Sequence, residues 1–236
     1  MDTGFAISAQ SISKAGDHQE GVVLLHGLSR SAASMGKMAR WLTDSGFVVV
    51  NQKYQSRRGS IAELSEQAIG QALNDSRLAE CPRIHFVTHS LGGVLVRSYC
   101  ARHPDVKIGR VVMLGPPNQG SEVVDRLGKW WLFRKILGPA GIELGTAPDS
   151  TPNRLGPVKF ELGVIAGESS LNWINSLMIT GTDDGKVSIE RTRVAGMKDH
   201  VVVPVMHPFL MKRRRVMELT VRFLNCGSFA DETDGW

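Results

Sequence analysis

Short apolar runs alternate with longer amphipathic stretches through the first half of the chain. The runs indicate buried strands, and the stretches between them place their apolar residues on one side of a helix. The predicted strands are residues 21–25, 47–51, 83–88 and 110–114, and the predicted helices are residues 31–45, 60–79 and 94–101. Ser60 and Glu63 are spaced as a capping box at the start of the second helix. This alternation predicts a mostly parallel sheet with helices on both faces.

The alternation breaks after the fourth strand. Residues 122–158 contain one amphipathic stretch, residues 123–137, and then a segment rich in Gly and Pro. Strand-like runs return at residues 159–166 and 201–205. A long insertion with little strand character is often a cover over a functional site. We therefore expect a single α/β domain over residues 1–236, with a cap or lid-like insertion at about residues 122–158.

Composition places the chain among ordinary globular proteins, with 42% hydrophobic and 22% charged residues. No apolar run approaches the roughly 20 residues of a spanning helix, so we do not expect an integral membrane protein. Residues 1–20 show no secretory signal, although a leader already removed would leave no trace. Cys81, Cys100 and Cys226 lack the spacing of a disulfide framework or a zinc site. We expect a cytoplasmic protein without a bound metal.

The chain is basic, with a net charge of +5 and an isoelectric point near 9.3. Much of the excess lies in the run Lys-Arg-Arg-Arg at residues 212–215, at the start of a predicted C-terminal helix. Such runs are commonly solvated helix faces, and contact with a phosphate or a lipid headgroup is the alternative. No aromatic residues interleave with the run as they do on single-stranded nucleic-acid platforms. We expect no nucleic-acid partner.

The segment after the third strand has the sequence Thr-His-Ser-Leu-Gly-Gly at residues 88–93. A serine at a sharp turn from strand to helix, a nucleophile elbow, needs small residues two positions before and after it, because strand and helix pass close together. Gly92 meets this need, whereas Thr88 stands where glycine is usual. The strand-like run before the turn and the helical stretch after it favour an elbow with Ser90 at its tip over a plain turn with a buried serine.

A serine nucleophile needs a histidine base and a carboxylate that orients the base. His207 follows the apolar run after residue 200 and therefore lies at the carboxyl end of a predicted strand, whereas His200 lies at its opposite end. Asp184 opens the polar turn Asp-Gly-Lys-Val, which can direct a carboxylate across the edge of the sheet. Asp183 is the alternative. The positions favour Ser90, His207 and Asp184 as one catalytic set.

The sequence His26-Gly27-Leu28 directly follows the first predicted strand. Acyl transfer places negative charge on the carbonyl oxygen, and two backbone N–H groups commonly stabilise it as an oxyanion hole. Gly27 allows the backbone to approach the substrate closely. We expect the amides of Leu28 and Leu91 to be the two donors. A histidine in an ordinary turn is the alternative interpretation of this segment.

Together these motifs resemble those of the α/β-hydrolase superfamily, and within it the small bacterial lipases and esterases that group with the lipase and GPI-inositol-deacylase (PGAP-like) families. The resemblance is carried by residues 24–28, 87–93, 114–121, 184–187 and 206–207. It implies the α/β-hydrolase fold and a serine carboxylic-ester hydrolase, an esterase or lipase, that needs no cofactor. It also implies an acyl-enzyme on Ser90, with His207 as general base and Asp184 as its orienting residue. Such esterases tolerate the departure at Thr88.

Several other activities occur with similar machinery. A dehalogenase or an epoxide hydrolase on this fold would need a carboxylate nucleophile at the elbow, so Ser90 excludes both. An acyltransferase, a thioesterase or an amidase would use the same triad, and the sequence does not separate them from an esterase. A binding protein without catalysis would be expected to lack at least one triad residue, and all three are present.

The insertion contains the apolar cluster Trp-Trp-Leu-Phe at residues 130–133, next to basic residues. These side chains can pack on the core, line an acyl pocket or lid, or contact a lipid interface. We assign Trp131 and Phe133 to substrate binding. Each interpretation is compatible with a small-molecule or lipid ester that has an apolar acyl group, with peripheral lipid contact as a further possibility.

Overall fold

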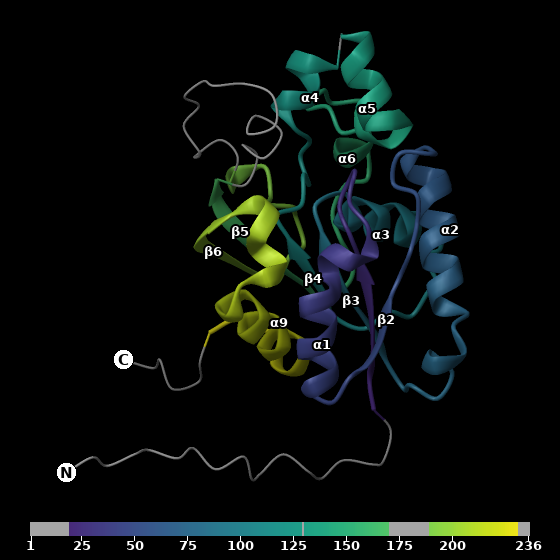
Figure 1. Cartoon of the computed structure of the whole chain (residues 1–236), viewed down its shortest axis with the longest axis vertical. Coiled ribbons are helices and arrows are strands. Elements are labelled where there is room, and N and C mark those ends of the chain that lie inside the picture. Colours follow the sequence, from purple (N-terminus) through teal and green to yellow (C-terminus); the bar gives the residue numbers. More distant parts are fainter. Residues whose placement is uncertain (1–18, 129, 170–188, 231–236) are drawn as a thin grey trace, which may run out of the picture.

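The computed structural model describes residues 19–128, 130–169 and 189–230. Its centre is a six-stranded sheet in the order β2-β1-β3-β4-β5-β6, in which every neighbouring pair is parallel (Figure 1). The strands are β1 Gly21–Leu25, β2 Val48–Asn51, β3 Ile84–His89, β4 Val111–Leu114, β5 Leu162–Ser169 and β6 Asp199–Met206. This arrangement confirms the predicted mostly parallel central sheet.

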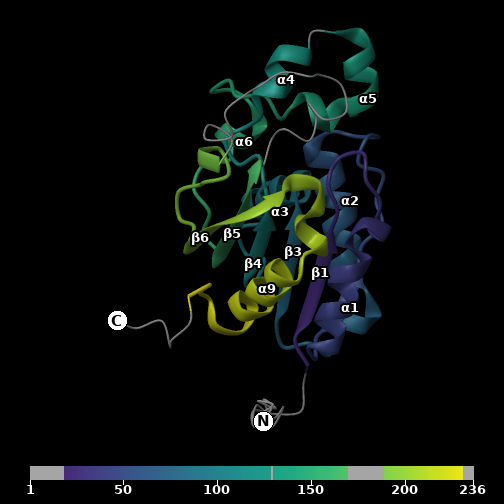
Figure 2. The same ribbon diagram turned by 60° about the vertical axis from the view of Figure 1, so that its left-hand side comes forward.

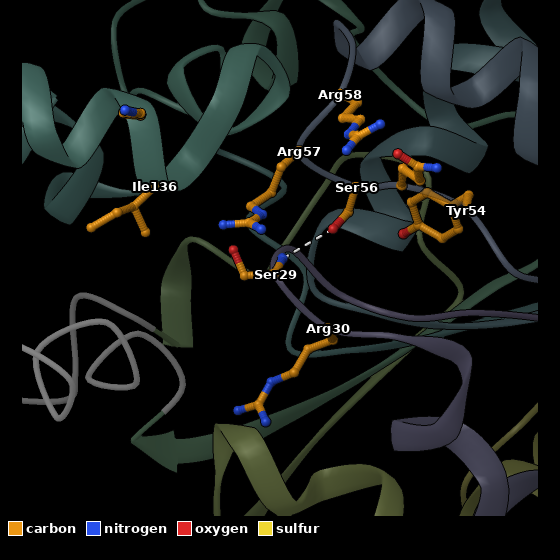
Figure 3. A pocket seen from close by; sticks show the side chains of 9 residues that line it. Ser29, Arg30, Tyr54, Ser56, Arg57, Arg58 and Ile136 are labelled. Atoms are coloured by element: carbon orange, nitrogen blue, oxygen red, sulfur yellow. Dashed lines mark hydrogen bonds between the residues drawn. The ribbon is translucent and has the colours of Figure 1, made fainter.

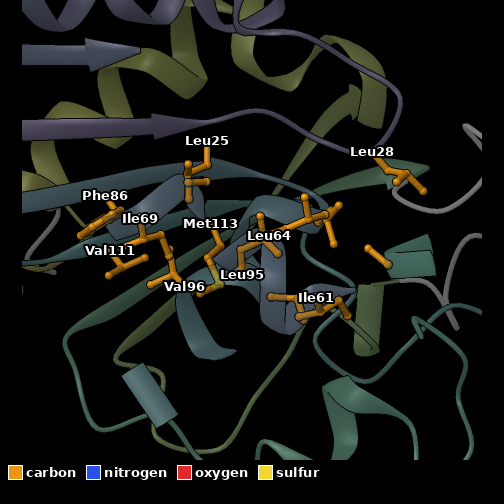
Figure 4. Close-up of a cluster of buried hydrophobic side chains, with 14 of the residues drawn as sticks. Leu25, Leu28, Ile61, Leu64, Ile69, Phe86, Leu95, Val96, Val111 and Met113 are labelled. Carbon is orange, nitrogen blue, oxygen red and sulfur yellow. The ribbon is translucent and has the colours of Figure 1, made fainter. Parts of the chain in front are cut away.

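Helices cover both faces of the sheet (Figures 1 and 2). Helices α1 Gly36–Asp44 and α9 Arg214–Cys226 lie on one face, and helices α2 Ile61–Leu73 and α3 Leu91–Arg102 lie on the other. Short 3-10 turns complete the connections, namely η1 Ala32–Met35, η2 Ser76–Leu78 and η3 His207–Lys212. Successive strand residues point to opposite faces. In β1, Leu25 therefore joins the core beneath α2 and α3, shown in Figure 4, whereas Leu24 joins the core beneath α1 and α9.

Two helix boundaries that differ from the sequence prediction are the start of α1 and the end of α2. The stretch at residues 31–45 begins as the turn η1 and becomes α-helical only at Gly36. The helix predicted to reach residue 79 ends at Leu73. Asn74 forms a turn, and Asp75 caps η2 by accepting a hydrogen bond from the Arg77 amide. The predicted start of α2 is confirmed, since Ser60 and Glu63 form both hydrogen bonds of the capping box.

The insertion forms three helices beyond the carboxyl ends of the strands, α4 Glu122–Leu127, α5 Trp131–Ile142 and α6 Thr151–Arg154 (Figure 1). The single amphipathic helix predicted at residues 123–137 is therefore wrong. Helix α4 ends at Leu127, and α5 begins separately at Trp131. Helix α5 is itself kinked at Gly138, which has a φ of 69° and precedes Pro139. A Cβ atom at Gly138 would lie 2.3 Å from the Arg57 carbonyl oxygen, so a close backbone contact accompanies the kink.

The C-terminal helix α9 buries Val216, Leu219 and Phe223 against the sheet. Phe223 lies so close to β5 that a Cβ atom at Gly163 would be 2.7 Å from its ring. The basic side chains at residues 212–215 are exposed. In the part of the chain that the structure describes, no helix has the length and apolar character needed to cross a membrane.

Candidate active site

Ser90 occupies the turn between β3 and α3. Its φ of 51° and ψ of −119° lie outside the regions that side-chain-bearing residues usually adopt. A backbone held in this way is commonly found at functional sites, where the surrounding packing enforces it. The Ser90 amide donates a hydrogen bond of 3.0 Å to the Leu114 carbonyl at the end of β4. The elbow is thus fixed to the neighbouring strand.

Two glycines allow α3 to pack directly against the sheet. A Cβ atom at Gly92 would lie 2.8 Å from the Leu25 carbonyl oxygen, and one at Gly93 would lie 2.9 Å from the Met113 sulfur. Thr88 is buried within β3, paired in register with Leu25 and Met113. The strand therefore accommodates a threonine at the position where elbows usually have glycine.

His207 lies directly after β6 and is fully buried. A Cβ atom at Gly115, which has a φ of 56°, would be 2.5 Å from His207 Nδ1. Because Gly115 follows the Leu114 carbonyl that accepts from Ser90, the serine and the histidine both flank the end of β4. His200 is instead the second residue of β6, and its Nε2 is 2.9 Å from Thr192 Oγ1. The structure therefore brings His207, and not His200, to the edge of the sheet that carries Ser90.

His89 supports His207 from the adjacent position of the elbow. The two rings are 4.5 Å apart between centroids, and His89 Nε2 donates a hydrogen bond of 3.2 Å to the His207 carbonyl. The sequence pattern alone gives His89 no role. A role for His89 could have been predicted from its position directly before Ser90, because a buried polar side chain at the end of a strand needs a hydrogen-bond partner.

Burial keeps both imidazoles neutral. It lowers the pKa of His89 to about 3, and the charge of Arg30 is a smaller contribution in the same direction. Burial also lowers the pKa of His207 well below its usual range, with additional contributions from His89 and Arg30. A neutral imidazole can accept a proton, so His207 is in the protonation state that a general base requires.

The loop after β1 runs beside the elbow. A Cβ atom at Gly27 would be 2.7 Å from His89 Nδ1 and 3.2 Å from Ser90 Cβ, which leaves no room for a side chain. His26 stacks on Tyr54 with ring centroids 4.1 Å apart, and the Tyr54 hydroxyl donates to the His26 carbonyl. These contacts hold the loop in place.

Leu28 and Leu91, the expected oxyanion-hole residues, are both buried. Neither amide donates a hydrogen bond to another described residue. The Leu91 amide also begins α3, where the helix dipole favours negative charge. Two such amides beside Ser90 could stabilise an oxyanion.

Other expected site residues are not brought to Ser90 by the described part of the structure. Asp184 and its alternative Asp183 lie outside the described residues. Trp131 is 75% exposed at the start of α5, and Trp130 is 66% exposed. Phe133 also belongs to α5, but its side chain lies outside the described part. One of the three interpretations of the aromatic cluster is that it packs on the core. For Trp130 and Trp131 this interpretation is wrong, because both side chains are exposed.

Groups of three or more His, Cys, Asp or Glu side chains that could hold a metal ion do not occur among the described residues. The chemistry gathered at the elbow is instead that of a serine with a buried histidine. No group in this set requires a metal to act as nucleophile or base.

The chain also matches a known protein family. A sequence model of the palmitoyl protein thioesterase family matches residues 21–147, which include β1, the elbow and most of the insertion. A comparison with curated proteins finds no match.

Solved structures with the same fold include two of the phospholipase PlaB from Legionella pneumophila. One has a TM-score of 0.65 at 16% identity over 89% of this chain and 61% of that chain. The other, in complex with thio-NAD, has a TM-score of 0.52 at 22% identity over 64% of this chain and 38% of that chain. The present chain therefore spans less than two thirds of either phospholipase chain.

A third similar structure is the mature Bacillus licheniformis lipase BlEst2, with a TM-score of 0.59 at 20% identity over 92% of this chain and 96% of that chain. At these identities the likeness shows a common fold. Together with the family match, it confirms the resemblance to α/β-hydrolases and the prediction of a hydrolase.

The buried neutral His89 should make stability depend on pH. In the unfolded chain its pKa is about 6.5, whereas in the folded chain it is about 3. As pH falls below 6.5, His89 is protonated in the unfolded state but not in the folded state, so the free energy of unfolding decreases. The loss is about 1.4 kcal/mol per pH unit for this group until pH approaches its folded pKa. Urea unfolding at pH 5.0 and 6.5 should show a shallower pH slope in His89→Gln than in the wild type.

The matched control is His103, which is half-buried directly after α3, on the opposite face of the sheet from α9, and pairs with Glu66. His103→Gln should keep the wild-type slope. Equal slopes in the wild type and in His89→Gln would contradict a neutral buried imidazole at position 89.

Proposed function

The chain belongs to the palmitoyl protein thioesterase family, and from this premise we propose that it hydrolyses esters of apolar acyl groups through a serine triad. Ser90 is the nucleophile, His207 the general base and Asp184 the residue that orients it. The observation that carries the proposal is the strained Ser90 elbow with neutral, buried His207 across the end of β4. Thioester hydrolysis is the second candidate, because the matching family is one of thioesterases.

The proposed reaction has two steps. Ser90 Oγ attacks the acyl carbonyl carbon while His207 takes the hydroxyl proton, and the Leu28 and Leu91 amides stabilise the oxyanion. The bond to the alcohol or thiol breaks, and the leaving group takes the proton from His207. Water then attacks the acyl-enzyme with His207 again as base, which releases the acid and restores Ser90. This sequence needs no cofactor.

Access to Ser90 requires a movement in this proposal. Ser90, His207 and Leu28 are all buried. In this proposal an ester carbonyl reaches Ser90 when a segment over the site is displaced. The insertion at residues 122–158 lies beyond the carboxyl ends of the strands and is the segment we assign to this role (Figure 2). Its aromatic residues Trp131 and Phe133 would then contact the acyl chain.

We also propose that the protein is cytoplasmic and makes peripheral contact with lipid. Exposed Trp130 and Trp131 lie close in sequence to Lys135, a combination that suits peripheral contact with a lipid surface. Cys81, Cys100 and Cys226 are free thiols, which is compatible with a cytoplasmic location. We propose no nucleic-acid partner.

Removal of Ser90 tests the proposal directly. Ser90→Ala should remain folded and lower kcat/KM by a factor on the order of 10⁶ for both p-nitrophenyl octanoate and octanoyl-N-acetylcysteamine, because triad members act as a unit. His207→Ala should be nearly as damaging. The matched control His200→Ala should stay within about tenfold of the wild type, since only a positioned base contributes fully. A Ser90→Ala protein that keeps its turnover would refute the mechanism.

The two candidate carboxylates are separated by paired substitutions. Asp184→Asn should reduce kcat on the order of 10³- to 10⁴-fold, because the imidazole loses both its orientation and the charge that stabilises imidazolium. Asp183→Asn should have little effect. Steady-state kinetics on p-nitrophenyl octanoate distinguishes them, and a larger loss at Asp183 would move the role to that residue.

Contact between α5 and the acyl chain predicts a change of chain-length preference. Trp131→Ala with Phe133→Ala should reduce kcat/KM for p-nitrophenyl esters of eight or more carbons, ~10-fold more than for the acetate, since only long chains use the lost apolar area. Because Trp131 is exposed, its loss should change the melting temperature little. Exposed Val202 on β6 provides the control Val202→Ala. An unaltered profile would exclude contact with the acyl chain.

A further inference from the structure

A large pocket opens beside the proposed oxyanion loop. Its volume is about 860 Å³, and it lies between the loop after β1, the loop before α2 and the first half of α5 (Figure 3). The lining residues are Ser29, Arg30, Tyr54, Gln55, Ser56, Arg57, Arg58, Lys135 and Ile136. Space of this size is sufficient for a polar group of a substrate.

The pocket is strongly cationic. Arg30, Arg57, Arg58 and Lys135 line it, and none of the lining residues is acidic. The side chains of these four residues form no ion pair or hydrogen bond with another described residue. Elsewhere in the molecule arginines do find carboxylates, as Arg191 does with Glu122 at 2.9 Å. Four cations that line one pocket, with no carboxylate among the lining residues, favour an anionic ligand.

The walls of the pocket are held together by hydrogen bonds from three segments. The Ser29 amide donates to Ser56 Oγ at 3.0 Å, which joins the loop after β1 to the loop before α2 (Figure 3). The Ala140 amide donates to the Gly59 carbonyl at 2.9 Å, which joins α5 to that same loop. The backbone of Arg57 lies against Gly138. The cationic side chains therefore project from a scaffold whose backbone is fixed.

The pocket adjoins the catalytic residues. Ser29 and Arg30 directly follow Leu28, whose amide we assign to the oxyanion hole. The charge of Arg30 contributes to lowering the pKa of both His89 and His207, which places its guanidinium within electrostatic reach of the proposed base. A ligand group bound here would lie next to the carbonyl under attack.

We propose that this pocket binds a phosphate carried by the leaving group of the acyl substrate. The inference rests on the proposed function, and it specifies the substrate as an acyl ester or thioester with a phosphorylated alcohol or thiol portion. Guanidinium groups suit this ligand because their paired N–H donors match phosphate oxygens. Two sources share the chemistry, namely a soluble acyl carrier such as coenzyme A and the headgroup of an anionic phospholipid.

Two matched pairs of substrates test the proposal and distinguish the sources. Octanoyl-coenzyme A and octanoyl-N-acetylcysteamine have the same thioester, but only the first carries the phosphorylated pantoyl and adenosine portion. Dioctanoyl phosphatidylglycerol and dioctanoylglycerol have the same acyl esters, but only the first carries a phosphoglycerol headgroup. For at least one pair, the wild type should prefer the phosphorylated member, and Arg57→Gln with Arg58→Gln should reduce that kcat/KM ratio at least tenfold. The pair that responds identifies the source.

The control variant is Lys37→Gln with Arg40→Gln, which removes two exposed cations from α1 and should leave both ratios unchanged. Ratios near one for both pairs, or a preference that survives the Arg57 and Arg58 substitutions, would overturn the proposal. If the protein hydrolysed none of the four substrates, the proposed function would fail by itself. The pocket would then be judged by calorimetry with free coenzyme A, which should bind the wild type and not the doubly substituted protein.

Discussion

The tight packing of the Ser90 elbow between β1 and β4 is the constraint on which the rest of the site depends. Gly92 and Gly93 bring α3 against the Leu25 carbonyl and Met113, and the Ser90 amide is bonded to Leu114. This packing holds Ser90 in its unusual backbone conformation. Because the strands are all parallel, the segments that follow β1 and β6 reach the same edge of the sheet. A strained serine and a buried histidine therefore both lie beside the end of β4.

Much of this arrangement could be predicted from the sequence. The four early strands, the capping box at Ser60 and the elbow are local patterns, and each is recognisable within a few residues. His207 was distinguished from His200 by its position after an apolar run, and the structure places the two histidines at opposite ends of β6. Periodicity and turn chemistry carry such information because they depend on neighbours in sequence.

Other features depend on contacts between distant segments and could not be predicted in this way. The kink at Gly138 accompanies its approach to Arg57, some eighty positions earlier in the chain. The hydrogen bond from His89 to the His207 carbonyl likewise depends on distant segments. So does the pocket that Arg30, Arg57 and Lys135 line together. A pattern of residue types does not specify which exposed cations will line the same pocket. The role of Asp184 stays a prediction from its turn sequence.

The glycines around the site divide the chain into positions that can change and positions that cannot. At Gly27, Gly92 and Gly115, any side chain would collide with the elbow, with β1 or with His207. Arg57 and Arg58, in contrast, are exposed side chains without partners among the described residues, on a backbone that other contacts hold in place. Variation in evolution, or by protein engineering, can therefore alter the charge of the pocket without disturbing the serine and histidine. The charge of the pocket and the packing of the elbow are thus set by separate residues.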